Sequence, residues 1–175
     1  GQVGNEAESW EEVTPRAVIR YELTDRSNIY ASFSQGFKSG TYNPSVNPSP
    51  PGVANRPVNP EYVDAYEIGY KISQANWRFA AAAFFSEYTD IQVNIQLGPS
   101  ILAYQNAGAA EIYGVELEWA ADLTDRFNLS AGAAWTHGEY TEFANAPISD
   151  GTNAPVIFGD VSGNTRSEEH TSELQ

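Results

Sequence analysis

The stretch from Glu111 to His137 alternates between apolar and polar residues with a period of two, on both sides of a break at residues 123–126. Successive side chains of a β-strand point to opposite faces, so this pattern predicts a β-hairpin with one apolar and one polar face. The residues expected on the apolar face are Tyr113, Val115, Leu117, Trp119, Phe127, Leu129, Ala131, Ala133 and Trp135.

The same alternation recurs along most of the chain. It predicts strands at residues 12–23, 28–35, 61–73, 77 to about 95, 101–121 and 126 to about 143. Tight turns are expected at 24–27, 74–76 and 122–125, and mostly longer connections at 36–60, 96–100 and beyond 143. The first turn sequence, LTDRSNI, recurs in the third turn as LTDRFNL. The expected fold is all-β, an antiparallel meander of about six long strands.

Two architectures produce such a meander: a soluble β-sandwich or jelly roll, and a transmembrane β-barrel. The predicted strands exceed the usual length of about 5–6 residues, and short turns alternate with long loops, which favours the barrel. Aromatic residues near the strand ends agree, because amphipathic rings prefer membrane–water boundaries. These residues are Tyr21, Trp77, Trp119, Phe33, Phe85 and Trp135. We therefore interpret the chain as an incomplete piece of a transmembrane barrel.

The charged residues of the strands fall on the predicted polar face. They are Arg16, Arg20, Glu67, Lys71, Arg78, Glu116 and Glu118. In a barrel this face lines the wet lumen, where unlike charges on neighbouring strands can pair. On the lipid face an Arg or Lys would cost about 2–4 kcal/mol at the midplane of the bilayer.

Composition narrows the classes of function. The chain has 175 residues, a formal net charge of −14 and no Cys. The charge argues against a nucleic-acid partner, which requires clustered Lys and Arg. The absence of Cys excludes disulfides, thiol nucleophiles and thiolate metal sites. No apolar run reaches the roughly 18 residues of a transmembrane helix, although a transmembrane strand needs only about 9–11 residues.

The two ends of the chain differ from the alternating part. The chain has no Met and no signal peptide, so we expect either a processed N-terminus or a piece of a longer protein. We expect residues 1–11 to be a loop lead-in and residues 144–165 to begin an extracellular loop. Residues 166–175 resemble the translation of a short-read sequencing adapter, and we exclude them from the fold as a non-native tail.

Several motifs resemble the barrel of TonB-dependent outer-membrane receptors. They are Thr14-Pro15-Arg16, Tyr30 to Lys38, Pro60-Glu61 with Tyr66 to Lys71, and Asn106-Ala107-Gly108 with Tyr113 to Glu116. The resemblance covers residues 12–143 and implies part of a barrel of about 22 strands with a plugged lumen. It also implies the outer membrane of a Gram-negative bacterium, contact with its lipid, and TonB as a partner through a plug and TonB box absent from this sequence. The implied function is energised uptake of a scarce nutrient chelate, by default an iron–siderophore.

The resemblance places ligand contacts on the long loops. Lys38, Tyr42 and Arg56 flank the longest connection, and a cation beside an aromatic ring suits an anionic chelate. The alternative is that these are ordinary solvated loop residues. Glu67 and Glu116 could also be read as an acid/base pair, but charge pairing within the lumen is the favoured interpretation.

No other chemistry is indicated by the sequence. The chain holds no Ser/His/Asp set, P-loop or dinucleotide motif, and we expect no enzyme activity, no cofactor and no metal site. His137 lies at the loop end of its strand, where we expect an interfacial residue rather than a metal ligand. The alternatives left open are a soluble carbohydrate-binding or structural β-sandwich and an unplugged porin.

Overall fold

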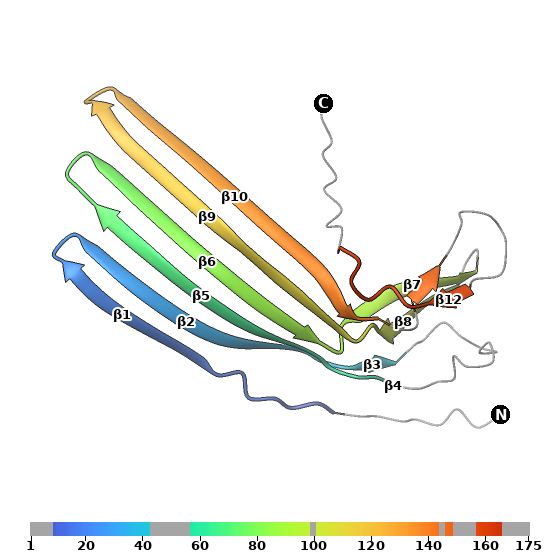
Figure 1. Ribbon diagram of the computed structural model, residues 1–175. Helices are drawn as coiled ribbons and strands as arrows, with labels where there is room; N and C mark the ends of the chain where they lie inside the picture. The colour runs from blue at the N-terminus through green and yellow to red at the C-terminus, as the bar shows by residue number, and fades with distance from the viewer. Residues whose placement is uncertain (1–8, 43–56, 99–100, 144–145, 149–156, 166–175) are drawn as a thin grey trace, which may run out of the picture.

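Six long strands form one antiparallel sheet (Figure 1). The computed structural model describes residues 9–42, 57–98, 101–143, 146–148 and 157–165, and every regular element within them is a strand. The sheet consists of β1 (Arg16–Thr24), β2 (Ser27–Lys38), β5 (Glu61–Ser73), β6 (Trp77–Thr89), β9 (Ala109–Thr124) and β10 (Phe127–Glu142). Its strands follow one another in chain order, which confirms the predicted all-β meander. Among the described residues, no helix is long and apolar enough to cross a membrane.

The three tight turns lie together at one end of the sheet (Figure 1). In the first, the N–H of Arg26 donates to Thr24 Oγ1 at 3.2 Å, and in the third the N–H of Arg126 donates to Thr124 Oγ1 at 3.3 Å. A hydroxyl that accepts from the backbone two residues later replaces a backbone turn bond. The sequence repeat therefore corresponds to one local structure used twice.

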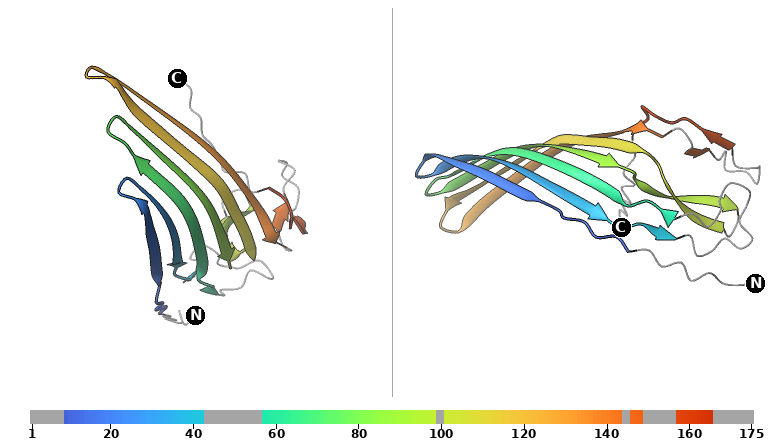
Figure 2. Two further views of the ribbon diagram at one scale, coloured as in Figure 1. Left: turned by 60° about the vertical axis from the view of Figure 1, so that its left-hand side comes forward. Right: turned by 90° about the horizontal axis from the view of Figure 1, so that it is seen from below.

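Two of the predicted long strands are each interrupted, and this part of the prediction is wrong. β6 ends at Thr89 and is followed by β7 (Gln92–Gly98), while β8 (Ile101–Asn106) precedes β9. The interruptions coincide with backbone of positive φ, 54° at Asp90 and 89° at Gly108. Among the described residues, β7 and β8 pair only with each other and form a hairpin that leaves the main sheet (Figure 2), so residues 96–98 of the predicted loop belong to a strand.

The predicted loop regions also contain short strands. β2 extends to Lys38, and the connection to β5 holds the paired β3 (Thr41–Tyr42) and β4 (Pro57–Val58). The region after residue 143 holds the paired β11 (Ala146–Ile148) and β12 (Ile157–Gly159). After β12, the hydroxyl and N–H of Ser162 hydrogen-bond Asp160 and hold the pKa of that carboxyl below its usual range. Pairs of two or three residues are too short to produce a recognisable period.

Large apolar side chains of the sheet are exposed rather than buried. Ile19, Ile68 and Trp135 expose 75%, 61% and 56% of their surfaces. The buried cluster lies instead at the loop end and contains Ile91, Ala107, Ala110, Phe143 and Ala146. In the described part of the chain the other sheets have two strands each and lie at that end (Figures 1 and 2). The sheet therefore lacks the second layer that a β-sandwich requires, and that alternative is not supported.

Candidate functional site

The register of the strands determines which side chains share a face, because residues paired across neighbouring strands point the same way. A cavity of about 660 Å³ lies on the polar face near the tight turns, and Lys71, Arg78 and Glu118 are among its wall residues. A concave polar face is the geometry of the inner wall of a barrel. The charges predicted for this face share it: Arg16, Arg20, Glu67, Lys71, Arg78, Glu116 and Glu118.

A tyrosine links three residues of this polar face. The hydroxyl of Tyr30 donates to Glu67 Oε1 at 2.6 Å. The Tyr30 ring lies against Gly69, its cross-strand neighbour, where a Cβ would collide with the ring. Lys71 Nζ lies 5.0 Å from the centre of the same ring, a cation–π contact. Gly69 thus makes room for a ring that joins a carboxylate to a cation.

This arrangement separates the two carboxylates considered as an acid/base pair. Glu67 is paired across the sheet with Phe84, whereas Glu116 is paired with Ala82, so strand β6 lies between them. Glu67 instead accepts a hydrogen bond from Tyr30. The geometry fits carboxylates held in a polar wall and lends no support to a shared acid/base site.

The opposite, outer face carries two rows that run across the strands at the loop end. The first is aromatic: Phe33, Tyr66, Phe85, Tyr113 and His137 lie in register. The ring centroids of Phe33 and Tyr66 are 5.1 Å apart, and those of Tyr113 and His137 are 5.3 Å apart. The second row, one step nearer the loops, is polar and mostly acidic: Gln35, Asp64, Glu87, Glu111 and Glu139.

From the acidic row to the tight turns, the outer face of the strands has no Asp, Glu, Lys or Arg. On β9 this uncharged face runs from Tyr113 to Leu123. At a rise of about 3.3 Å per residue this is roughly 33 Å along the strand. A strand tilted by about 40° then crosses roughly 25 Å, the height of the apolar band of an outer-membrane barrel. On β9 the outer face therefore has the height of a lipid-facing surface, whereas on β5 the uncharged stretch, Tyr66 to Ile72, is shorter.

Two of the predicted ligand residues, Lys38 and Tyr42, lie at the opposite end from the tight turns, and no contact between them is described. Lys38 ends β2; its Nζ lies 3.9 Å from Glu61 Oε2, and 58% of its side-chain surface is exposed. Tyr42 lies on β3 with its ring centroid 6.4 Å from that of Trp10. Arg56 lies outside the described residues.

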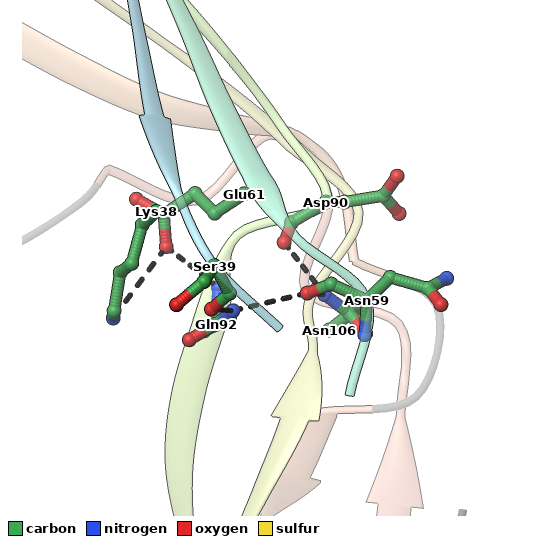
Figure 3. A network of polar contacts seen from close by, with 7 residues as sticks. All are labelled: Lys38, Ser39, Asn59, Glu61, Asp90, Gln92 and Asn106. Atoms are coloured by element: carbon green, nitrogen blue, oxygen red, sulfur yellow. Dashed lines mark hydrogen bonds and ion pairs between the residues drawn. The ribbon is translucent and has the colours of Figure 1, made fainter. Parts of the chain in front are cut away.

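Sequence reasoning did not single out three amide residues that meet beside Lys38. The side-chain amides of Gln92 and Asn106 both donate to the backbone carbonyl of Asn59, and the backbone N–H of Asn59 donates to Asn106 Oδ1 (Figure 3). The available signal was the Asn106-Ala107-Gly108 motif, which the sequence alone could mark as characteristic but could not connect with Gln92 or Asn59.

Comparison with known proteins decides what this sheet belongs to. The family model described as TonB dependent receptor-like, beta-barrel, matches residues 2–165. The chain belongs to the TonB-dependent receptor family. The probable TonB-dependent siderophore receptor PiuA of Acinetobacter baumannii is 28% identical over 134 residues, which cover 74% of this chain and 18% of that protein. The pesticin receptor of Yersinia enterocolitica is 34% identical over 145 residues, which cover 78% of this chain and 20% of that receptor.

Solved structures of receptors share the fold. The ferric yersiniabactin uptake receptor FyuA of Yersinia pestis matches 71% of this chain and 18% of its own, with a TM-score of 0.60 and 27% identity. The alcaligin receptor FauA of Bordetella pertussis matches 83% of this chain and 23% of its own, with a TM-score of 0.53. At 19% identity FauA supports the fold alone. The chain spans about a fifth of the length of the curated relatives it matches.

Membership of the receptor family indicates where in the cell the sheet lies and what it is part of. TonB-dependent receptors lie in the outer membrane of Gram-negative bacteria, and this places the chain there. The six strands are an unclosed part of a barrel wall. The porin alternative is not favoured, because the matching family model is that of the receptor barrel.

Proposed function

We propose that the protein takes up a scarce metal nutrient as a chelate, by default an iron–siderophore complex. The observation that carries this proposal is the agreement among relatives that each match most of this chain. Their names include a probable siderophore receptor, a metal-pseudopaline receptor and a ferric-pyoverdine receptor. The solved structure of FyuA is that of a ferric yersiniabactin uptake receptor.

We further infer how the two faces of the sheet contribute to uptake. The hollow polar face lines the lumen, and the uncharged outer face contacts outer-membrane lipid. TonB supplies energy through parts of the receptor outside these residues. The barrel wall binds and guides its cargo without making or breaking covalent bonds, so the protein is a transporter and not an enzyme.

Chelate uptake is tested in the full-length receptor that carries this segment, expressed in a Gram-negative strain without its own siderophore receptors. We expect uptake of radiolabelled iron presented as ferric yersiniabactin or ferric pyoverdine, and loss of that uptake when TonB is deleted. Iron uptake that is equal with and without the receptor, for every chelate tried, would contradict the proposed cargo class. TonB-independent permeation of small neutral sugars would point instead to an open pore.

A further inference from the structure

Two loops at the mouth of the barrel wall meet at their bases. One is the connection between β2 and β5, which contains β3 and β4, and the other is the hairpin β7–β8. The hairpin residues Gln92 and Asn106 are cross-strand partners at its foot. Both side chains reach the backbone of the other loop (Figure 3).

Gln92 holds both ends of the β2–β5 connection. Its Nε2 donates to the carbonyl of Ser39 at 2.9 Å and to the carbonyl of Asn59 at 3.0 Å. Its backbone N–H donates to Glu61 Oε2 at 2.9 Å, and the same oxygen lies 3.9 Å from Lys38 Nζ. One side chain from the hairpin thus fixes where the other loop leaves β2 and where it returns to β5.

Asn106 completes the junction with a reciprocal pair of bonds. Its Nδ2 donates to the carbonyl of Asn59 at 3.1 Å, while its Oδ1 accepts the N–H of Asn59 at 2.8 Å. The same Nδ2 donates to the carbonyl of Asp90 at 2.7 Å, at the positive-φ residue where the hairpin leaves the sheet. An amide with both donor and acceptor engaged fixes the orientation of both partners.

The hairpin is also anchored beneath this junction. Ile91 and Ala107 each expose 2% of their surface, and they pack in the buried cluster with Phe143. Their backbones are paired, with the N–H of Ala107 donating to the carbonyl of Ile91 at 2.6 Å. The foot of the hairpin is therefore a fixed point to which Gln92 and Asn106 attach the neighbouring loop.

We propose that Gln92 and Asn106 form a latch, a pair of positioning residues that makes the described bases of the β2–β5 connection, at Ser39 and Asn59, move as one unit with the foot of the β7–β8 hairpin. The role of that unit in presenting residues such as Lys38 to a chelate rests on the proposed function. The latch itself does not, because it follows from bonds between the loops. Moving the foot of the hairpin away from Ser39 and Asn59 requires breaking the hydrogen bonds that Gln92 and Asn106 make to them.

The test compares the full-length receptor with a variant that carries Gln92→Met and Asn106→Leu, which keep side-chain size and remove the amide donors. Gln35→Met is the matched control: Gln35 donates to Asp64 between neighbouring strands and contacts neither loop in the hydrogen bonds described. The segment contains no Cys, so nitroxide labels can be attached at cysteines introduced at the exposed Pro57 and Asn94. Pulsed electron paramagnetic resonance then measures the distance distribution between the loops.

We expect a narrow distribution in the wild-type and Gln35→Met receptors and a distribution at least about twice as wide in the latch variant. Hydrogen exchange at the backbone amide of Asn59 should rise about tenfold in the latch variant, because the hydrogen bond from this amide to Asn106 Oδ1 is lost. Equal widths and equal exchange in all three proteins would overturn the latch. The distance distribution could widen in the latch variant while the wild-type receptor takes up no metal chelate. In that case the proposed function fails and the latch stands.

Discussion

At the residue scale, the Asn106-Ala107-Gly108 motif has a separate physical role at each position. The amide of Asn106 joins two loops, and Ala107 is buried where a larger side chain would find little room. Gly108 has a φ of 89°, and a Cβ there would collide with the carbonyl of Glu142 on the next strand. Asn106 thus supplies hydrogen bonds, Ala107 allows close packing, and Gly108 adopts a backbone conformation that other residues disfavour.

Gly108→Ala should lower the free energy of unfolding by about 2–4 kcal/mol, because it combines unfavourable backbone with a collision against Glu142. Denaturant unfolding of the full-length receptor measures the change. Gly163→Ala is the control, since Gly163 has a φ of 81° and nothing within 4 Å of the added Cβ. It should cost only about 1 kcal/mol. Equal costs at both positions would mean that the contact with Glu142 has no effect.

Lys38→Gln should weaken binding of an anionic ferric chelate about threefold to tenfold, because an exposed cation at the loop end of β2 is lost. Titration of the full-length receptor with ferric yersiniabactin measures the dissociation constant. Arg126→Gln removes an exposed cation at the opposite end of the sheet and should leave the affinity unchanged. The same affinity in Lys38→Gln and wild-type receptors would exclude Lys38 as a ligand contact.

At the scale of elements, the sequence predicts the six long strands and their two faces because alternation persists wherever one face is wet and the other apolar. The interruptions at Asp90 and Gly108 escape prediction because the alternation lapses there for only a few residues and then resumes, and nothing in the sequence marks Asp90 as a residue of positive φ. The amide junction also escapes it. Asn59, Gln92 and Asn106 lie far apart in the chain and meet only after the strands have paired.

Two adjacent alanines in the middle of β6 test the assignment of faces. Ala81 is paired with Tyr70 and Leu117 on the outer face, whereas Ala82 is paired with Gly69 and Glu116 on the polar face. Ala81→Arg should lower barrel stability by about 2–4 kcal/mol, because the cation would lie in the hydrocarbon region. Ala82→Arg gains a carboxylate neighbour and should be tolerated. Folding into lipid vesicles at increasing urea measures both, and the reverse order would invert the two faces.

At the scale of the whole molecule, the sheet is one layer whose described apolar residues find few partners within the chain. Among the described residues, β1 pairs only with β2, and β10 pairs only with β9 apart from an isolated bridge between Glu139 and Thr165. Backbone groups left unpaired in lipid cost several kcal/mol each. The wall therefore depends on neighbouring strands to close its edges and on lipid to cover its outer face.

Residues 1–165 expressed alone should neither insert into detergent micelles as a stable sheet nor resist proteolysis. The reason is that both edge strands would present open rows of backbone donors and acceptors. Electrophoresis of unboiled and boiled samples measures this, because folded outer-membrane barrels change migration on heating. The full-length receptor is the positive control. A heat-modifiable, protease-resistant band from the isolated segment would contradict the expectation.

The acidic row on the outer face has a further consequence, because barrel strands tilt by about 35–45° from the membrane normal. A row that runs perpendicular to tilted strands is inclined to the plane of the membrane. Its members therefore lie at different depths. Along the strand, Gln35 lies nearer to the tight turn of its strand than Glu139 does to its own. The row therefore lies deepest at β2, where its end member is the neutral Gln35, hydrogen-bonded to Asp64 at 2.9 Å. Within this row, the neutral residue thus occupies the position that lies deepest in the membrane.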